Sequence, residues 1–304
     1  MSTLELIKRL REESGAGMSE CKKAVDASNG NYEAAFDWLR TNAKSKVAKN
    51  AARIAAEGLV GVSVKGLQGA IIEVNSQTDF VAQNEIFKQI VSNGASNALQ
   101  VSDVEALKKT KIGAETIEEF IANATLSIGE KIDLRRMFKI EVSKGLVSHY
   151  VHNAVEGSPN LGKIAVLVAL KSEASAEKLA ELGKQICMHI AASTTKYLNV
   201  KDVPETEISR EKKILLEQVS DVKKPQAVID KMIEGRMEKF YAEVVLLEQI
   251  FIMDTSMKIK DLIAKASKEI GTSVEIESFA KVVVGEGIEK QETDFAKEVA
   301  EMSK

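Results

Sequence analysis

The spacing of apolar residues changes near Glu57, and this change constrains the fold more than any other feature of the chain. Before it, apolar residues recur at helical spacing, as in Leu6, Ile7 and Leu10. After it, GLVGVSVKG and GAIIEVN have the pattern of strands and join across residues 66–69, which predicts a β-hairpin. Strand pairs then alternate with helical segments. This order predicts an α+β fold with antiparallel sheets, rather than a doubly wound parallel sheet.

The first fifty residues predict a bundle of three short helices around Trp38. Ser19 can cap the second helix, and Asn29 and Gly30 can end it, because both tolerate the left-handed conformation of a helix C-cap. Asn31 can cap the third helix. Three short helices around one tryptophan make about the smallest unit that folds alone.

In the rest of the chain, segments with the apolar spacing of strands alternate with segments that have the apolar spacing of helices. RRMFKIEV and LVSHYVH predict a second pair of strands, and KIAVLVALK and SVEIESFAKVVVG predict further strands. The expected helices cover residues 81–99, 103–109, 115–128, 175–196 and 258–270, and QETDFAKEVAEMSK predicts a terminal helix.

Residues 205–240 consist almost entirely of helix formers. Ile208, Leu215 and Val222 lie seven residues apart, and Pro225 suits the first position of a second helix. An apolar seam this narrow cannot cover a globular core, which favours a projecting coiled-coil hairpin. Ordinary helices packed on the body of the protein are the alternative.

Composition limits the possible partners. A chain of 304 residues fits two or three domains, and a net charge of −3 gives no general attraction to nucleic acid or anionic membranes. Two cysteines suit a reducing compartment. The chain has no apolar run long enough to span a membrane, and its start lacks the apolar region of a secretory signal. We expect a cytoplasmic protein with no direct nucleic-acid or membrane partner.

Candidate catalytic and metal-ligating residues are few. His149 and His152 are three residues apart, and Cys187 and His189 are two apart, but neither spacing is that of a typical zinc site. The apolar neighbours of Cys187 are expected to raise the pKa of its thiol and so disfavour a nucleophilic role. A hydrolase built on Cys187 and His189 is the remaining enzymatic alternative. We expect no cofactor, no metal and no covalent catalysis.

An aromatic residue stands in an otherwise polar junction. The stretch NSQTDFVAQN, residues 75–84, separates a predicted strand from a predicted helix, and Phe80 follows Asp79 within it. Junctions lie at the surface and are usually polar. One explanation is structural: Thr78 or Asp79 caps the helix, and Phe80 packs back on it as a hydrophobic staple. The other is a functional role for Phe80, and the pattern alone does not decide between them.

Five stretches spread from residue 10 to residue 296 together resemble the family of translation elongation factor Ts. They are LREESGAGMSECKKA, EVNSQTDFVAQN, ICMHIAAS, EGRMEKF and GEGIEKQETDFA. The resemblance covers the whole chain and is specific, because several stretches are long and unusual. It implies a guanine nucleotide exchange factor that binds elongation factor Tu in its GDP-bound and nucleotide-free forms. It also implies that this chain binds neither nucleotide nor metal itself.

The resemblance further implies a plan of domains, with an N-terminal module like a ubiquitin-associated domain. The expected units are residues 1–53, a three-helix partner-binding module; 54–144, a first core subdomain; 145–198 with 236–264, a second core subdomain; 199–235, a coiled-coil hairpin; and 265–304, a final core strand with a C-terminal helical module.

By similarity, Thr78, Asp79, Phe80 and Val81 match the motif that enters a groove beside the magnesium site of elongation factor Tu. We call these four residues the TDFV segment. Its insertion is expected to disturb the groups that order Mg²⁺. This ion bridges a phosphate oxygen of GDP to protein ligands, so disordering it weakens nucleotide binding.

Other partner contacts follow from the same resemblance. Lys8, Arg11, Met18 and Ser19 match positions that face the partner's G domain, although the family also places a second methionine where Ser19 stands. His152 matches a histidine near the partner's third domain, but the loop after it, NAVEGSPNLG, is longer than the family pattern. A homodimer through the hairpin is compatible with its seam. An adapter that binds ubiquitin-like or nascent chains through the N-terminal bundle is the alternative function, and it leaves the TDFV segment without a role.

Overall fold

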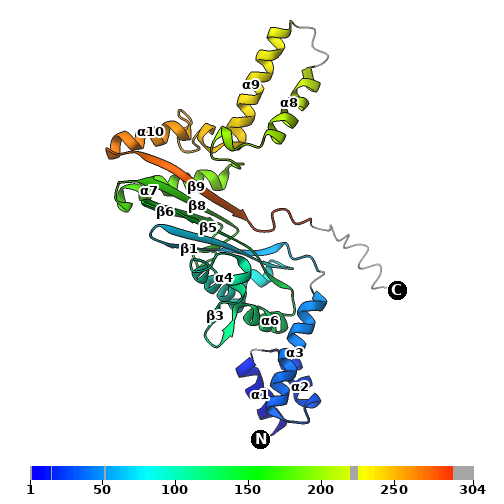
Figure 1. Cartoon of the computed structure of the whole chain (residues 1–304). Coiled ribbons are helices and arrows are strands. Elements are labelled where there is room, and N and C mark those ends of the chain that lie inside the picture. Colours follow the sequence, from blue (N-terminus) through cyan, green and yellow to red (C-terminus); the bar gives the residue numbers. More distant parts are fainter. Residues whose placement is uncertain (1, 15, 51–52, 220–224, 290–304) are drawn as a thin grey trace.

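A computed structural model describes residues 2–14, 16–50, 53–219 and 225–289 (Figure 1). A three-helix bundle lies at one end, two antiparallel sheets with their helices form the body, and a helical hairpin projects from the other end. The predicted α+β class is confirmed. The predicted terminal helix, QETDFAKEVAEMSK, begins after Lys290 and lies outside the described residues.

The N-terminal bundle contains α1 (Thr3–Ser14), α2 (Met18–Ala27) and α3 (Tyr32–Asn50). Asn29 and Gly30 end α2 with positive φ angles, and the Asn31 side chain accepts a hydrogen bond from the Ala34 amide, both as predicted. Two expectations were wrong. Ser19 does not cap α2, because the helix already begins at Met18 after an extended Gly17. Trp38 is only half-buried, and the bundle centre consists of smaller residues: Leu10, Cys21, Ala24 and Ala35.

The first sheet has the strand order β5-β2-β1-β7. β1 (Glu57–Lys65) and β2 (Gln68–Ser76) form the predicted hairpin, flanked by β5 (Ile132–Glu141) and β7 (Leu161–Gly162). Helices pack on one face of this sheet and bury an apolar cluster against it. They are α4 (Glu85–Ala98), α5 (Val104–Lys108) and α6 (Ile117–Ile128), with a small hairpin, β3 (Lys111–Ile112) and β4 (Glu115–Thr116), before α6.

The second sheet has the strand order β6-β8-β9, formed by β6 (Gly145–His152), β8 (Ile164–Ser172) and β9 (Val274–Val283). Its outer face packs on α7 (Ala176–Ala192) and α10 (Ile259–Ile270). Its inner face packs on the first sheet through a shared cluster from both sheets: Val60, Val62, Ile71, Val147, Ala165, Leu167, Ala169 and Val282. The body therefore has four layers, with helices outside and the sheets between them.

The predicted pairing of RRMFKIEV with LVSHYVH is wrong. β5 pairs with β2, and β6 pairs with β8, so the two neighbouring strands belong to different sheets. The reason lies in β8, whose residues from Ala165 to Leu170 are completely buried on both faces. A strand without a solvent-facing side is stable only in the centre of a sheet, so β8 needs a neighbour at each edge.

The hairpin consists of α8 (Glu205–Val219) and α9 (Gln226–Val244). It is joined to the body by the short helices η2 (Val200–Asp202) and η3 (Leu246–Glu248). An apolar cluster around Val203, Val244 and Val245 fixes its base. Pro225 stands one residue before α9 rather than in its first position. Within the described residues, no helix is both long enough and apolar enough to cross a bilayer.

Candidate functional site

The TDFV segment follows β2 directly and is held firmly on its N-terminal side. The Thr78 amide and the Thr78 hydroxyl both donate to the carboxylate of Glu130, at 3.0 and 2.8 Å. The Thr78 carbonyl accepts from the Ser76 hydroxyl at 2.8 Å. All three polar groups of Thr78 therefore have partners, which fixes the backbone just before Asp79.

A second anchor lies on the C-terminal side of the segment. Val81 and Ala82, in the short helix η1 (Phe80–Gln83), are 4% and 1% exposed and belong to the core under the first sheet. Asn84 then caps α4, and its side chain accepts from the Ile86 amide at 2.9 Å. The segment is thus fixed at both ends, and only Asp79 and Phe80 face solvent.

Phe80 is 84% exposed, more than any other large apolar side chain in the described residues. The structural explanation for this residue is therefore wrong: Phe80 does not pack back as a staple, and neither Thr78 nor Asp79 caps α4. An exposed aromatic side chain on a fixed backbone loses little conformational freedom on binding, which makes it a good anchor in a partner pocket.

The other candidate partner residues lie apart from this segment. Lys8 and Arg11 on α1, and Met18 and Ser19 at the start of α2, are all exposed. His152 ends β6 and is exposed, with its Nδ1 3.2 Å from the Tyr150 hydroxyl. Each group therefore offers accessible side chains, but the structure does not bring them together with the TDFV segment into one cluster.

Cys187 and His189 lie on α7 in the interior. Burial raises the pKa of the Cys187 thiol well above its usual range, which keeps it un-ionised as expected. His189 is 1% exposed, and burial lowers its pKa although the hydrogen bond with Gln249 opposes this effect. The Cys187 thiol is thus un-ionised, and both ring nitrogens of His189 are already engaged, Nδ1 by the Ile252 amide and Nε2 by Gln249, which speaks against a nucleophile and base pair at these residues.

His189 instead ties α7 to the segment that follows the hairpin. Its Nδ1 accepts from the Ile252 amide at 3.3 Å, so Nε2 carries the proton and donates to Gln249 at 2.8 Å. Thr195 donates to the same amide oxygen of Gln249, and the Gln249 nitrogen donates to the Glu243 carbonyl, both at 2.7 Å. This network is a structural joint that requires neutral histidine.

The pH dependence of stability tests this joint. His189→Gln should lower the free energy of unfolding at pH 8 by about 1–3 kcal/mol, because buried groups lose their partners. Burial holds the folded pKa of His189 below the ordinary histidine value of 6.5, so its stabilising effect is complete above pH 6.5 and is lost as the pH falls through the folded pKa. Urea unfolding at pH 8 and pH 5 should therefore show a smaller difference at pH 5. Exposed His152→Gln is the control, and an equal difference at both pH values would contradict the assignment.

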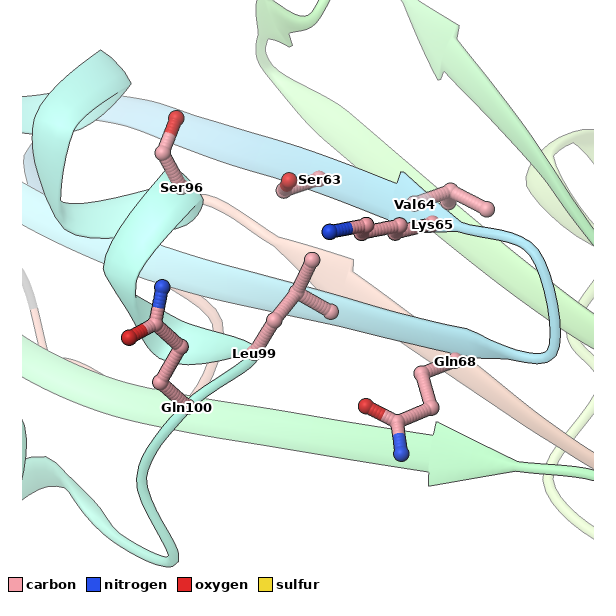
Figure 2. A pocket seen from close by; sticks show the side chains of 7 residues that line it. All are labelled: Ser63, Val64, Lys65, Gln68, Ser96, Leu99 and Gln100. Carbon is pink, nitrogen blue, oxygen red and sulfur yellow. The ribbon is translucent and has the colours of Figure 1, made fainter.

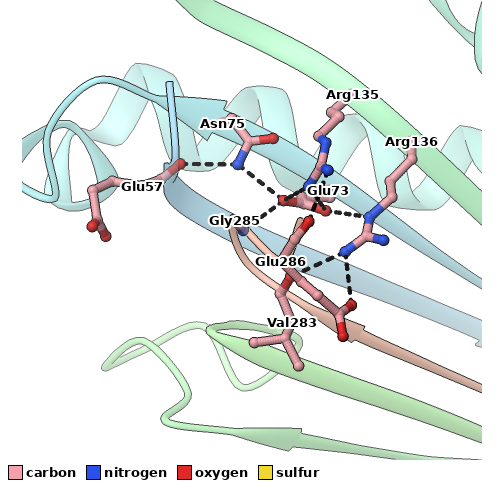
Figure 3. A network of polar contacts seen from close by, with 8 residues as sticks. All are labelled: Glu57, Glu73, Asn75, Arg135, Arg136, Val283, Gly285 and Glu286. Carbon is pink, nitrogen blue, oxygen red and sulfur yellow. Dashed lines mark hydrogen bonds and ion pairs between the residues drawn. The ribbon is translucent and has the colours of Figure 1, made fainter. Parts of the chain in front are cut away.

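A buried ion cluster lies where β2 and β5 meet the end of β9 (Figure 3). Glu73 on β2 is completely buried, and its carboxylate accepts from Arg135, Arg136, Asn75 and the Gly285 amide. Burial tends to raise the pKa of Glu73, but the hydrogen bonds from Gly285, Asn75 and Arg136 and the charge of Arg136 together hold it below its usual value.

The cluster depends on an irregularity in the β2–β5 pairing. Glu73 pairs with Arg136 and Val74 with Leu134, so Arg135 is an extra residue on β5. This β-bulge lets two consecutive arginines reach one carboxylate, although consecutive strand residues normally point to opposite faces. The arginines also bind the carbonyls of Val283 and Glu286, which fastens the end of β9 to the first sheet. Sequence reasoning missed the cluster; its only signal was a glutamate in the apolar strand GAIIEVN.

A hollow of about 530 Å³ lies between the β1–β2 hairpin and the end of α4 (Figure 2), and Lys65 is the one charged residue among those that line it: Ser63, Val64, Lys65, Gln68, Ser96, Leu99 and Gln100. Among the described residues, no three His, Cys, Asp or Glu side chains gather as a metal site.

Comparisons with known proteins agree with the resemblance noted in the sequence. The model of the family described as "Elongation factor TS" matches residues 77–286. Elongation factor Ts of Rhodospirillum rubrum is 48% identical over 302 residues, covering 98% of this chain and 97% of that protein. Elongation factor Ts of Bradyrhizobium diazoefficiens is 46% identical over 303 residues (99% and 98%), and that of Rickettsia bellii is 44% identical over 300 residues (98% and 96%).

Proposed function

Since this chain belongs to the elongation factor Ts family, we propose that it is a nucleotide exchange factor of translation elongation that acts on elongation factor Tu. The observation that supports a specific mechanism is the 84% exposure of Phe80 between two fixed anchors. A side chain held out in this way is available to a partner without rearrangement.

In the proposed mechanism, Asp79 and Phe80 enter the partner beside its magnesium site. The ion bridges a phosphate oxygen of GDP to protein ligands, so moving those ligands weakens the hold on GDP. Phe80 supplies free energy by leaving water, and the Asp79 carboxylate brings a negative charge close to groups that bind a cation. No covalent bond forms or breaks in this sequence of steps.

Reciprocity makes the process catalytic in turnover. If binding of this protein weakens the partner's affinity for nucleotide, then nucleotide binding weakens the partner's affinity for this protein by the same factor. Incoming GTP therefore releases the exchange factor, which can act on another GDP complex. Each 1.4 kcal/mol of this coupling corresponds to about a tenfold change in affinity.

We also propose further contacts with elongation factor Tu and a domain organisation for the chain. The exposed residues Lys8, Arg11, Met18 and Ser19 are proposed to bind the partner's G domain, and His152 its third domain. The five units expected from the sequence are proposed as the domain plan, with the hairpin as a contact between two copies of the chain. A cytoplasmic location follows from the proposed role.

The proposed function is tested with elongation factor Tu loaded with fluorescent GDP and chased with excess unlabelled nucleotide. The full-length protein should accelerate release, and the rate should saturate as its concentration rises. Addition of more GDP should dissociate the complex between the two proteins, as reciprocity requires. No acceleration at saturating concentration would overturn the proposed function.

A further inference from the structure

We propose that Glu130 is a positioning residue for nucleotide exchange: it holds Thr78 so that Phe80 points toward the partner. This inference rests on the proposed function and deepens it. Glu130 lies 52 residues from Thr78 in the sequence and makes both contacts through one carboxylate, at 3.0 Å to the amide and 2.8 Å to the hydroxyl. Together the two contacts fix both the position of Thr78 and the orientation of the peptide group that carries its amide.

The position of Glu130 is unfavourable for the helix that precedes it. Glu130 follows Gly129, the C-cap of α6, which has a left-handed backbone with φ of 87°. The C-terminus of a helix carries a partial negative charge and favours Lys or Arg, not an acidic residue. Helix stability therefore does not account for a glutamate here, whereas the pair of donors on Thr78 does.

Phe80 depends on this contact because little else orients it. Its side chain is almost entirely in solvent, so only the backbone sets its direction. Asp79, between Thr78 and Phe80, makes no side-chain capping bond to η1. Thr78 is thus the last residue before Phe80 whose side chain is held by another part of the chain, and Val81 is the first buried residue after it; between them, the Asp79 carbonyl accepts a hydrogen bond from the Ala82 amide at 3.1 Å.

Loss of the carboxylate should leave the TDFV segment attached but less well oriented. Val81 and Ala82 remain buried, so the fold persists, while the Thr78 amide and hydroxyl lose their acceptor. Phe80 then adopts several directions, and the protein must select the productive one on each encounter. The cost falls on the exchange step more than on complex formation, since the other contacts with the partner are unchanged.

The experiment uses the full chain with Glu130→Ala, Glu130→Gln and, as matched control, Glu118→Ala at an exposed residue of α6, the helix that precedes Glu130. Release of fluorescent GDP from elongation factor Tu is measured over a range of concentrations of each variant. Glu130→Ala should lower the maximal rate by about tenfold, with a change of less than about threefold in the concentration for half-maximal rate. Glu130→Gln, which keeps one acceptor oxygen, should fall between wild type and Glu130→Ala.

Two further measurements separate positioning from a general loss of structure. Amide hydrogen exchange at Thr78 should accelerate in Glu130→Ala while the amides of β1 and β2 keep their protection. The double variant Glu130→Ala/Phe80→Ala should be no slower than Phe80→Ala alone, because Glu130 acts through Phe80.

Either of two results would overturn the inference: wild-type maximal rates in Glu130→Ala, or an additive loss in the double variant. The proposed function fails separately, if wild type itself does not accelerate release.

Discussion

Phe80→Ala should lower the maximal rate of GDP release from elongation factor Tu by about 10- to 100-fold. Burial of one aromatic side chain contributes roughly 1.5–3 kcal/mol, and every 1.4 kcal/mol is a factor of ten. Stability should change by less than about 0.5 kcal/mol, because Phe80 is 84% exposed and leaves no cavity when truncated. The measurement is stopped-flow release of fluorescent GDP at saturating concentration of each protein.

A matched control is Phe138→Ala, which removes the other exposed phenylalanine in the described residues, one that is 39% exposed and lies on β5. This variant should release GDP at the wild-type rate. If Phe80→Ala and wild type are equally fast, exchange does not depend on Phe80 and the proposed insertion is wrong, even though the protein is an exchange factor. If Phe138→Ala is as slow as Phe80→Ala, the effect is not specific to the TDFV segment.

Glu73→Gln should destabilise the protein by about 2–3 kcal/mol at pH 7. Removing one partner of a buried ion pair leaves the other charge uncompensated, which costs about 3–5 kcal/mol. We expect a cost at or below the bottom of this range, because the Arg135 and Arg136 side chains are 26% and 25% exposed and keep some hydration. Urea unfolding monitored by circular dichroism measures the difference. Glu105→Gln, which breaks the exposed pair with Lys108, should cost less than about 0.5 kcal/mol.

The Glu73 effect should also depend on pH in a defined direction. The folded pKa of Glu73 lies below the ordinary glutamate value of 4.5, so its charge stabilises the fold fully above that pH. This contribution is lost as the pH falls through the folded pKa and the carboxyl becomes neutral. The difference between wild type and Glu73→Gln should therefore be constant above about pH 5.5 and shrink below pH 4.5. A difference that does not shrink would mean that shape, and not charge, makes Glu73 important.

Local sequence patterns predicted the local structure well. The β1–β2 hairpin, the C-terminal end of α2 and the two helices of the hairpin depend on turn residues and on short-range spacing, which a sequence displays directly. Resemblance to a family drew attention to the TDFV segment. The pattern around Phe80 did not show whether its side chain is buried. Its burial depends on which other parts of the folded chain lie next to this strand–helix junction, and local spacing does not reveal them.

Contacts between distant residues were not predictable in the same way. Glu130 reaches Thr78 across 52 residues, and Glu73 reaches the Gly285 amide across 212. Neither glutamate has a motif around it, and only the folded chain gives each one its partner. The wrong pairing of β5 with β6 has the same origin, since the neighbour of a strand is chosen by the burial of β8 and not by order along the chain.

The way the chain alternates between its two sheets determines when a newly made molecule can complete its fold. β7 adds to the edge of the first sheet about a hundred residues after β1, and β9 completes the second sheet only near residue 283. Such distant pairings make folding slow, because a long loop must close before each pairing is formed. During synthesis on the ribosome, Glu73 stays without its Gly285 partner until residue 285 has emerged. The first sheet therefore has all its strands early, but both sheets wait for the segment around residues 274–285 before their last partners are in place. The intermediate that exists until then exposes unpaired strand edges and is the form most prone to aggregation.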